Sequence, residues 1–225
     1  GEKNSAFGYN SLSDNTTGTQ NTAVGRSALQ NSTTASNNTA IGELSLAANT
    51  TGGSNVAVGR IALAANTTAS NNTAVGYGSL AANTTGTNNV ALGANALDAN
   101  TTANANSAVG KNALGANTTG PENTAVGEQA MATNTTGGTN VAVGREALKA
   151  NTTASNNTAV GYRSLLANTT GANRTAIGFE SSKGSDTETD GTVSVGYRAM
   201  YMNAATTADA TDSVAVGYLA LGATA

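Results

Sequence analysis

Residues 21–28 are Asn-Thr-Ala-Val-Gly-Arg-Ser-Ala, and residues 123–130 are Asn-Thr-Ala-Val-Gly-Glu-Gln-Ala. The phrase recurs along the chain, with a marker glycine after each Ala-Val or Ala-Ile pair or a close variant of it. A repeat of fixed length indicates a stack of similar structural units. The marker glycines are 17 residues apart at Gly8, Gly25, Gly42, Gly59, Gly76, Gly93, Gly110, Gly127, Gly144, Gly161 and Gly178, and the spacing then loosens to 18 at Gly196 and 21 at Gly217.

The length of the repeat decides the fold class. Seventeen residues are too few for a strand, a crossover helix and two connections, which together need about 30 residues. We therefore predict an all-β, parallel β-solenoid of about thirteen coils. Each coil should contain a short strand ending at Val-Gly, a second strand through Ala-Leu and a corner at Asn-Thr-Thr, since glycine permits bends and asparagine favours turns. Residues 1–178 should form the regular solenoid, and residues 179–225 should form irregular C-terminal coils of the same solenoid.

The composition argues against a conventional core and against common enzymatic sites. Only 4% of the 225 residues are aromatic, and Trp, Cys and His are absent, which excludes disulfides, His or Cys zinc ligands and the usual general base. The net charge of −3 gives no electrostatic basis for nucleic-acid binding, and no apolar run approaches the roughly 18 residues of a membrane span. Carboxylates such as Glu43 and Asp98 occur singly. We expect no enzyme, no catalytic residue, no nucleic-acid partner and no membrane insertion.

Stacking turns each position of the repeat into a column, with neighbours about 4.8 Å apart. The residue four positions before the marker glycine is asparagine in ten successive coils, which predicts a ladder of side-chain amides. The ladder consists of Asn4, Asn21, Asn38, Asn55, Asn72, Asn89, Asn106, Asn123, Asn140 and Asn157.

An apolar column precedes the marker glycines. Its members are Val24, Ile41, Val58, Val75, Leu92, Val109, Val126, Val143, Val160 and Ile177. Adjacent strand residues point to opposite faces, so Ala23 beside Val24 and Ala28 beside Leu29 would put apolar side chains on both faces of a thin coil. Either the alanines fill the interior while Val and Leu meet neighbouring chains, or the reverse holds. A third arrangement is a monomer with a Val and Leu core and exposed alanines.

The residue after the marker glycine carries alternating charge in two places. Arg26, Glu43 and Arg60 form one triad, and Lys111, Glu128 and Arg145 form another. Opposite charges on paired neighbours stabilise a sheet, so we expect an ion-pair column on the solvent face. The alternative is inheritance, because residues 49–88 match residues 134–173 at 34 of 40 positions and the second triad overlaps this copied block.

The phrase Asn-Thr-Ala-Val-Gly-x-x-Ala resembles the head repeats of YadA-like trimeric autotransporter adhesins, and similar repeats occur in phage tail fibres. The resemblance extends from Asn4 to about Leu221. It implies a left-handed parallel β-roll, assembly of three rolls into a trimer, and attachment to host cells or matrix. The unit here is longer, and no coiled-coil stalk or membrane anchor accompanies it. Bacterial adhesin, phage fibre and free filament therefore all remain open, with an extracellular, cell-surface or virion location.

One segment in the irregular part suggests a cation site. Asp186, Glu188 and Asp190 alternate before Gly191, as carboxylates do at the start of a calcium loop. Position 197, where such a loop requires a further acidic ligand, is tyrosine. The segment is therefore either a Ca²⁺ site or a solvated surface loop, and no other cofactor is expected.

The Asn-Thr-Thr corners match the N-glycosylation sequon, although turn chemistry explains the same residues. Rows of threonine also raise the alternative of an ice-binding protein. The two threonines of each corner are adjacent, however, so we expect them to point in opposite directions rather than to form one flat array. Aromatic residues gather toward the C-terminus as either an end cap or a receptor-contact region; they are Tyr162, Phe179, Tyr197, Tyr201 and Tyr218.

The expected function is that of a structural or adhesive fibre: a stiff rod that mediates attachment or forms a filament. The first coil begins close to residue 1 without a polar cap, so we expect copies or further protein to stack head to tail. The partners would be other copies of the chain, most simply in a trimer, and a host-cell surface or glycan receptor. An ice-binding solenoid is the alternative, and a glycan-degrading spike has the weakest support.

Overall fold

A computed structural model describes residues 1–184, 190–201 and 213–222. These residues contain thirteen three-residue strands and no helix, and thus no helix that could cross a membrane. The predicted all-β, parallel β-solenoid is confirmed. The strands are β1 (Ser5–Phe7), β2 (Thr22–Val24), β3 (Thr39–Ile41), β4 (Val56–Val58), β5 (Thr73–Val75), β6 (Val90–Leu92), β7 (Ser107–Val109), β8 (Thr124–Val126), β9 (Val141–Val143), β10 (Thr158–Val160), β11 (Thr175–Ile177), β12 (Val193–Val195) and β13 (Val214–Val216).

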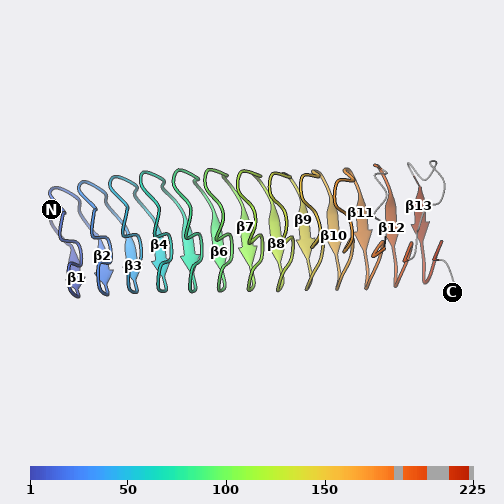
Figure 1. Ribbon diagram of the computed structural model, residues 1–225, viewed down its shortest axis with the longest axis horizontal. Helices are drawn as coiled ribbons and strands as arrows, with labels where there is room; N and C mark the ends of the chain where they lie inside the picture. The colour runs from blue at the N-terminus through green and yellow to red at the C-terminus, as the bar shows by residue number, and fades with distance from the viewer. Residues whose placement is uncertain (185–189, 202–212, 223–225) are drawn as a thin grey trace. The chain divides into compact units, whose positions relative to one another are not determined.

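The chain divides into two compact units, residues 1–112 with β1 to β7 and residues 113–225 with β8 to β13. Within each unit the strands lie side by side in chain order and pair in parallel (Figure 1). The register advances by one coil per pair, so Ala23 lies opposite Ala40 and Ala159 opposite Ala176. The longer coils of the second unit keep this register, because Ile177 still pairs with Val195 and Val195 with Val216.

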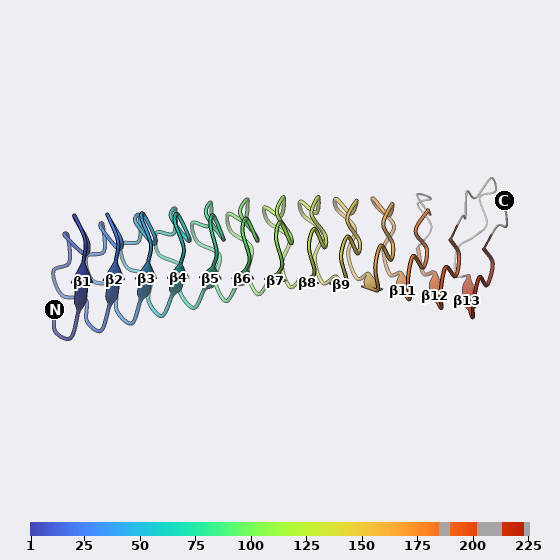
Figure 2. The ribbon, with the colours of Figure 1, turned by 90° about the horizontal axis from the view of Figure 1, so that it is seen from below.

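The interior of each coil is narrow and is filled by small and medium side chains. The strands lie along one side of the coils of each unit and the turns along the other (Figure 2). The middle alanine of a strand, such as Ala23, is fully buried, and so are Ala28 and Leu29 of the turn that follows. A space this thin has no room for large rings, which accounts for the scarcity of aromatic residues.

The second strand that we predicted through Ala-Leu is wrong. Within the described residues this part of each coil forms turns, and the leucine adopts left-handed backbone, with φ of 50° at Leu29. Bonding between coils persists, because Ser27 N donates to Tyr9 O at 2.9 Å and Leu29 N donates to Ser45 O at 3.0 Å. The left-handed residues rotate the chain, so neighbouring side chains no longer alternate between faces and both Ala28 and Leu29 point inward.

The apolar columns are arranged differently from all three of the arrangements considered from the sequence. The Ala and Leu columns together fill the interior, whereas the Val column lies on the outer face of the sheet. Val24 is 36% exposed and Leu92 is 43% exposed. Position 1 of each strand, occupied by Thr, Val or Ser, shares this outer face because it alternates with the buried middle residue.

Candidate functional site

The marker glycines all lie directly after a strand and have left-handed backbone, with φ from 128° at Gly217 to 139° at Gly8. They stand in a file within each unit: a Cβ on Gly25 would lie 2.7 Å from the carbonyl carbon of Gly42, and a Cβ on Gly42 would lie 2.6 Å from that of Gly59. Only glycine combines this backbone with so close an approach.

The asparagines that precede the strands form the hydrogen-bonded column that the sequence suggested. Asn38 N donates to Asn21 Oδ1 at 3.0 Å, and Asn38 Nδ2 donates to Gly52 O at 2.9 Å. Each side chain therefore makes two bonds onward along the stack: Asn38 Oδ1 accepts from Asn55 N at 2.9 Å, and Asn38 Nδ2 donates to the corner carbonyl of Gly52. The same contacts to the backbone N–H of the following asparagine recur at Asn4, Asn21, Asn38, Asn55, Asn72 and Asn89 in the first unit, and at Asn123 and Asn140 in the second.

A second amide ladder runs through the Asn-Thr-Thr corners, and the sequence analysis missed it. Asn66 Nδ2 donates to Asn49 Oδ1 at 2.9 Å, and Asn83 Nδ2 donates to Asn66 Oδ1 at 3.0 Å. From Asn49 to Asn168 the first residue of every Asn-Thr-Thr triplet is buried. N-glycosylation of these asparagines is therefore contradicted, because a glycan must attach to an exposed amide nitrogen. The asparagine that recurs at this repeat position in every coil from Asn49 to Asn168 was the available signal.

The corner ladder is interrupted where Ser32 replaces asparagine. Within the described residues Ser32 Oγ and Asn15 Oδ1 are buried without a hydrogen-bond partner. An asparagine at position 32 would donate to Asn15 Oδ1, as Asn66 donates to Asn49, and would accept from Asn49 Nδ2.

We therefore expect Ser32→Asn to raise the free energy of unfolding by about 1–3 kcal/mol, the usual cost of an unsatisfied buried polar group. Chemical denaturation measures this change. Ser32→Ala is the matched control: it removes the unpaired hydroxyl without completing the ladder, so its gain should be smaller. A loss of stability in Ser32→Asn would show that the corner has no room for the amide.

Arg174 occupies the next position of the first ladder, after Asn157, and is buried. Its backbone N donates to Asn157 Oδ1 at 2.9 Å, and its Nη1 donates to Asn168 Oδ1 at 2.6 Å. One residue thus donates to the last asparagine side chain of both ladders, immediately before the coil spacing changes. Burial lowers the pKa of Arg174, and the nearby Asp190 carboxylate partly offsets this effect.

Ion pairs on the solvent side follow the column after the marker glycine. Glu43 Oε1 accepts from Arg26 Nη2 at 2.6 Å, and Glu43 Oε2 accepts from Arg60 Nε at 3.1 Å. These two arginines lower the pKa of the Glu43 carboxyl. In the second unit Glu128 pairs with Arg145 at 3.6 Å. All these side chains are at least one-third exposed, so the pairs contribute little to stability.

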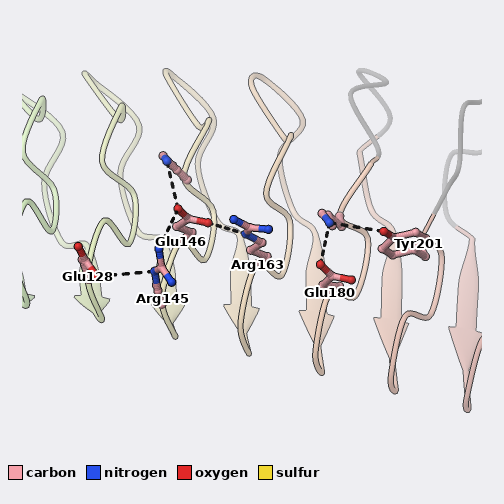
Figure 3. Close-up of polar contacts among 8 residues, drawn as sticks. Glu128, Arg145, Glu146, Arg163, Glu180 and Tyr201 are labelled. Atoms are coloured by element: carbon pink, nitrogen blue, oxygen red, sulfur yellow. Dashed lines mark hydrogen bonds and ion pairs between the residues drawn. The ribbon is translucent and has the colours of Figure 1, made fainter.

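A second charge column, two positions after the marker glycine, was not predicted. Its members Glu146, Arg163, Glu180 and Arg198 alternate in sign, and the two carboxylates are buried. Figure 3 shows the first three of these residues. Arg163 Nε donates to Glu146 Oε2 at 2.5 Å, and Arg198 Nη2 lies 2.8 Å from Glu180 Oε2. The hydrogen bond from Arg163 lowers the pKa of Glu146. Burial raises the pKa of Glu180, but hydrogen bonds from Lys183 and Arg198 outweigh it and the net shift is downward.

The C-terminal aromatic residues form a stack within the second unit. Ring centroids are 5.2 Å apart for Tyr162 and Phe179, 5.3 Å for Phe179 and Tyr197, and 5.2 Å for Tyr197 and Tyr218. Tyr201 lies apart from this stack and instead packs against Arg198, whose guanidinium carbon is 4.6 Å from the ring centroid. The inner rings Phe179 and Tyr197 therefore have ring neighbours on both sides, whereas Tyr218 at the end of the stack is 74% exposed.

Two of the three predicted calcium ligands, Asp186 and Glu188, lie outside the described residues. The third, Asp190, accepts a hydrogen bond at its Oδ1 from the backbone N of Ala172 at 2.7 Å. No group of three or more acidic side chains that could hold a metal ion occurs in the described part of the chain. The calcium site stays a prediction.

No protein-family model matches the chain, and no curated protein or solved structure matches it. The function must therefore be inferred from the surfaces of the solenoid. Three features can carry such an inference: the outer face of the strands, the exposed corner threonines and the charged side of the second unit.

Proposed function

We propose that the protein is a structural and adhesive fibre protein, a stiff extracellular or virion rod whose copies pack together through the outer face of the strands. The single observation that carries the proposal is this apolar face. Half-exposed Val, Ile and Leu side chains line it in a continuous column within each unit, for example Val24, Ile41 and Leu92. Continuous apolar surface of this kind is typical of protein–protein interfaces.

The thinness of the coil supports self-association. The alanine and leucine columns already fill the interior, so the outer valines stay partly exposed in the described residues, as Val24 does at 36%. Burying this face against another copy would remove apolar surface from water, which stabilises at about 25 cal/mol per Å². Three copies related by a threefold axis satisfy every face within a closed ring. The resemblance to YadA-like head repeats favours the same number of chains.

Stiffness within a unit follows from the density of bonds between coils. Gly42 N donates to Val24 O at 2.8 Å, Leu44 N donates to Arg26 O at 2.9 Å, and both amide ladders run alongside. Such bonding tolerates little bending, because most positions are tied to the coils above and below. We assign the protein a mechanical and attachment role without catalysis, and place the host-cell surface or glycan receptor on a side that assembly leaves exposed.

The mass of the native protein in solution tests the proposal. We expect a trimer by light scattering, and a monomer when the outer face carries two charges in Ile41→Lys/Leu92→Lys, since both side chains are exposed in the single chain. Thr51→Lys/Thr102→Lys adds the same charge at exposed corner positions of the same unit and should stay trimeric. A monomeric native protein, or equal dissociation of both variants, would refute assembly through this face. Electron micrographs that show only short separate particles would refute head-to-tail stacking.

Ice binding is the second candidate, and one observation favours it. The second threonine of each corner is exposed, so Thr51, Thr68 and Thr85 form a regular file. The first threonine is committed to the next coil, as Thr50 Oγ1 donates to Thr67 O at 3.1 Å, which halves the available hydroxyls. Thermal hysteresis in a solution of the protein would support this candidate, and ordinary freezing would exclude it.

A further inference from the structure

The charges on one side of the second unit are layered. Glu146 and Glu180 lie beneath the surface, with side chains 9% and 5% exposed. The cations that contact them are more exposed than the carboxylates, from 23% at Lys183 to 56% at Arg145. We call these cations the arginine face; they are Arg145, Lys149, Arg163, Lys183 and Arg198.

This layering leaves positive charge toward solvent. Even with Glu128 included, five cations face three carboxylates, and two of those carboxylates are covered. The first unit has no counterpart in its described residues, because Glu43 is itself partly exposed between Arg26 and Arg60 and the column two positions after the glycine is uncharged there. A surface with cations outside and anions inside attracts anions although the whole chain is acidic.

The arginines retain donors for a ligand. Arg163 contacts Glu146 through Nε, and a guanidinium has five N–H donors. Its Nη groups can therefore donate to a second acceptor. Arg145 reaches Glu128 and Glu146 only at 3.6 and 3.9 Å, so these contacts occupy it weakly.

Aromatic rings hold the guanidinium planes in place. Arg163 lies 4.9 Å from the centroid of Tyr162, and Arg198 lies 5.3 Å from that of Tyr197 and 4.6 Å from that of Tyr201. Cation–π contacts and the buried carboxylates behind them restrict the side chains before any ligand arrives. Preorganisation of this kind reduces the entropy lost on binding.

We propose that the arginine face binds a linear acidic polysaccharide, a sugar chain that carries carboxylate or sulfate groups at regular intervals. Arginine or lysine donors at successive coils suit anionic groups repeated along a polymer, and guanidinium pairs with carboxylate or sulfate oxygens through two N–H groups. In the proposed complex, Tyr162 and Tyr197, which lie beside Arg163 and Arg198, offer hydroxyl groups to the hydroxyl groups of the sugar. The inference names the receptor class of the proposed attachment function and rests on that function.

Two other ligand classes fit less well. Single-stranded nucleic acid binds by stacking bases on exposed aromatic faces, but here the faces of Phe179 and Tyr197 meet other rings at 5.2–5.3 Å. A neutral glycan would stack on the same faces and would leave the cations without an acceptor. Charge, rather than stacking, therefore selects the ligand.

Biolayer interferometry with immobilised polysaccharides tests the inference on the native assembly. We expect binding to heparin, weaker binding to hyaluronate, none to neutral dextran, and a fall in affinity with added salt. Arg145→Gln/Arg163→Gln should weaken heparin binding by about ten-fold or more, because each lost charge removes a charge-assisted contact. Arg26→Gln/Arg60→Gln changes the net charge equally in the first unit and should keep the affinity within about two-fold, a change of under about 0.5 kcal/mol.

The fold of each variant is checked by circular dichroism and thermal melting. If the double variant melts early, Arg145→Gln alone answers the question, since its exposed side chain makes only long contacts and a several-fold loss is still expected. Absence of heparin binding, equal losses in both double variants, or tighter binding of an oligothymidylate than of heparin would each overturn the inference. If the native protein is a trimer but does not bind heparin, only this inference is refuted. If it is a monomer and binds heparin, only the proposed assembly is refuted.

Discussion

Gly76→Ala is expected to lower the free energy of unfolding by about 3–5 kcal/mol, combining backbone strain with overpacking. Gly76 has φ of 133°, which L side chains rarely adopt, and a Cβ there would lie 2.6 Å from Gly93 O. Neither coil can move away, because each is bonded to the coils on both sides. The midpoint of guanidinium unfolding measures the loss.

Gly78→Ala is the control for this prediction. Gly78 lies two residues away with φ of 65°, and the atom nearest to its added Cβ would be the side-chain Oδ1 of Asn95. An amide side chain can move where a backbone carbonyl cannot, so the expected loss is only about 1 kcal/mol, the cost of left-handed backbone. Equal losses of stability in the two variants would mean that the close approach between successive marker glycines does not exclude a side chain at Gly76.

Asn72→Ala should lower the free energy of unfolding by about as much as Gly76→Ala does. The Asn72 side chain accepts from Asn89 N at 2.9 Å and donates to Gly86 O at 2.8 Å, and the residue is fully buried. Its removal leaves a buried donor and a buried acceptor without partners, and each costs about 1–3 kcal/mol. Denaturant titration of the variant measures the sum.

Asn71→Gly is the matched control for the ladder. Asn71 is exposed and has φ of 62°, so glycine keeps its backbone while removing a side chain on the surface. We expect a change within about 0.5 kcal/mol, as is usual for surface positions. If Asn72→Ala and Asn71→Gly changed the free energy of unfolding equally, the amide ladder would not contribute to the stability of the stacked coils.

The sequence was sufficient to predict the parts of the fold that depend on one residue repeated at one spacing. The marker glycines placed the strand ends, and their 17-residue interval predicted the parallel stack. The sequence was not sufficient to predict the turn through Ala28 and Leu29. Leucine rarely adopts left-handed backbone, so a leucine in the sequence does not indicate such a turn. The direction in which Val24 points followed from that turn, so it too needed the structure.

The charged sites show the same limit. Arg26, Glu43 and Arg60 were found because they fall in successive coils directly after a marker glycine. Glu146 and Arg163 lie one position further on, where the first unit carries Ser27, Leu44 and Ile61 and no charge. The burial of Glu146 and the cation–π contact of Arg163 depend on left-handed turns that periodicity alone does not reveal.

The position of Arg174 at the end of both amide ladders affects how the number of coils can change in evolution. Because this residue closes both amide ladders from one position, whole coils added or removed before it would leave its contacts unaltered. Unequal recombination between the near-identical repeat modules could then lengthen or shorten the protein in 17-residue steps. The length would then change through the coils before Glu128, while the coils that carry residues 145–198, to which we assign ligand binding, were kept.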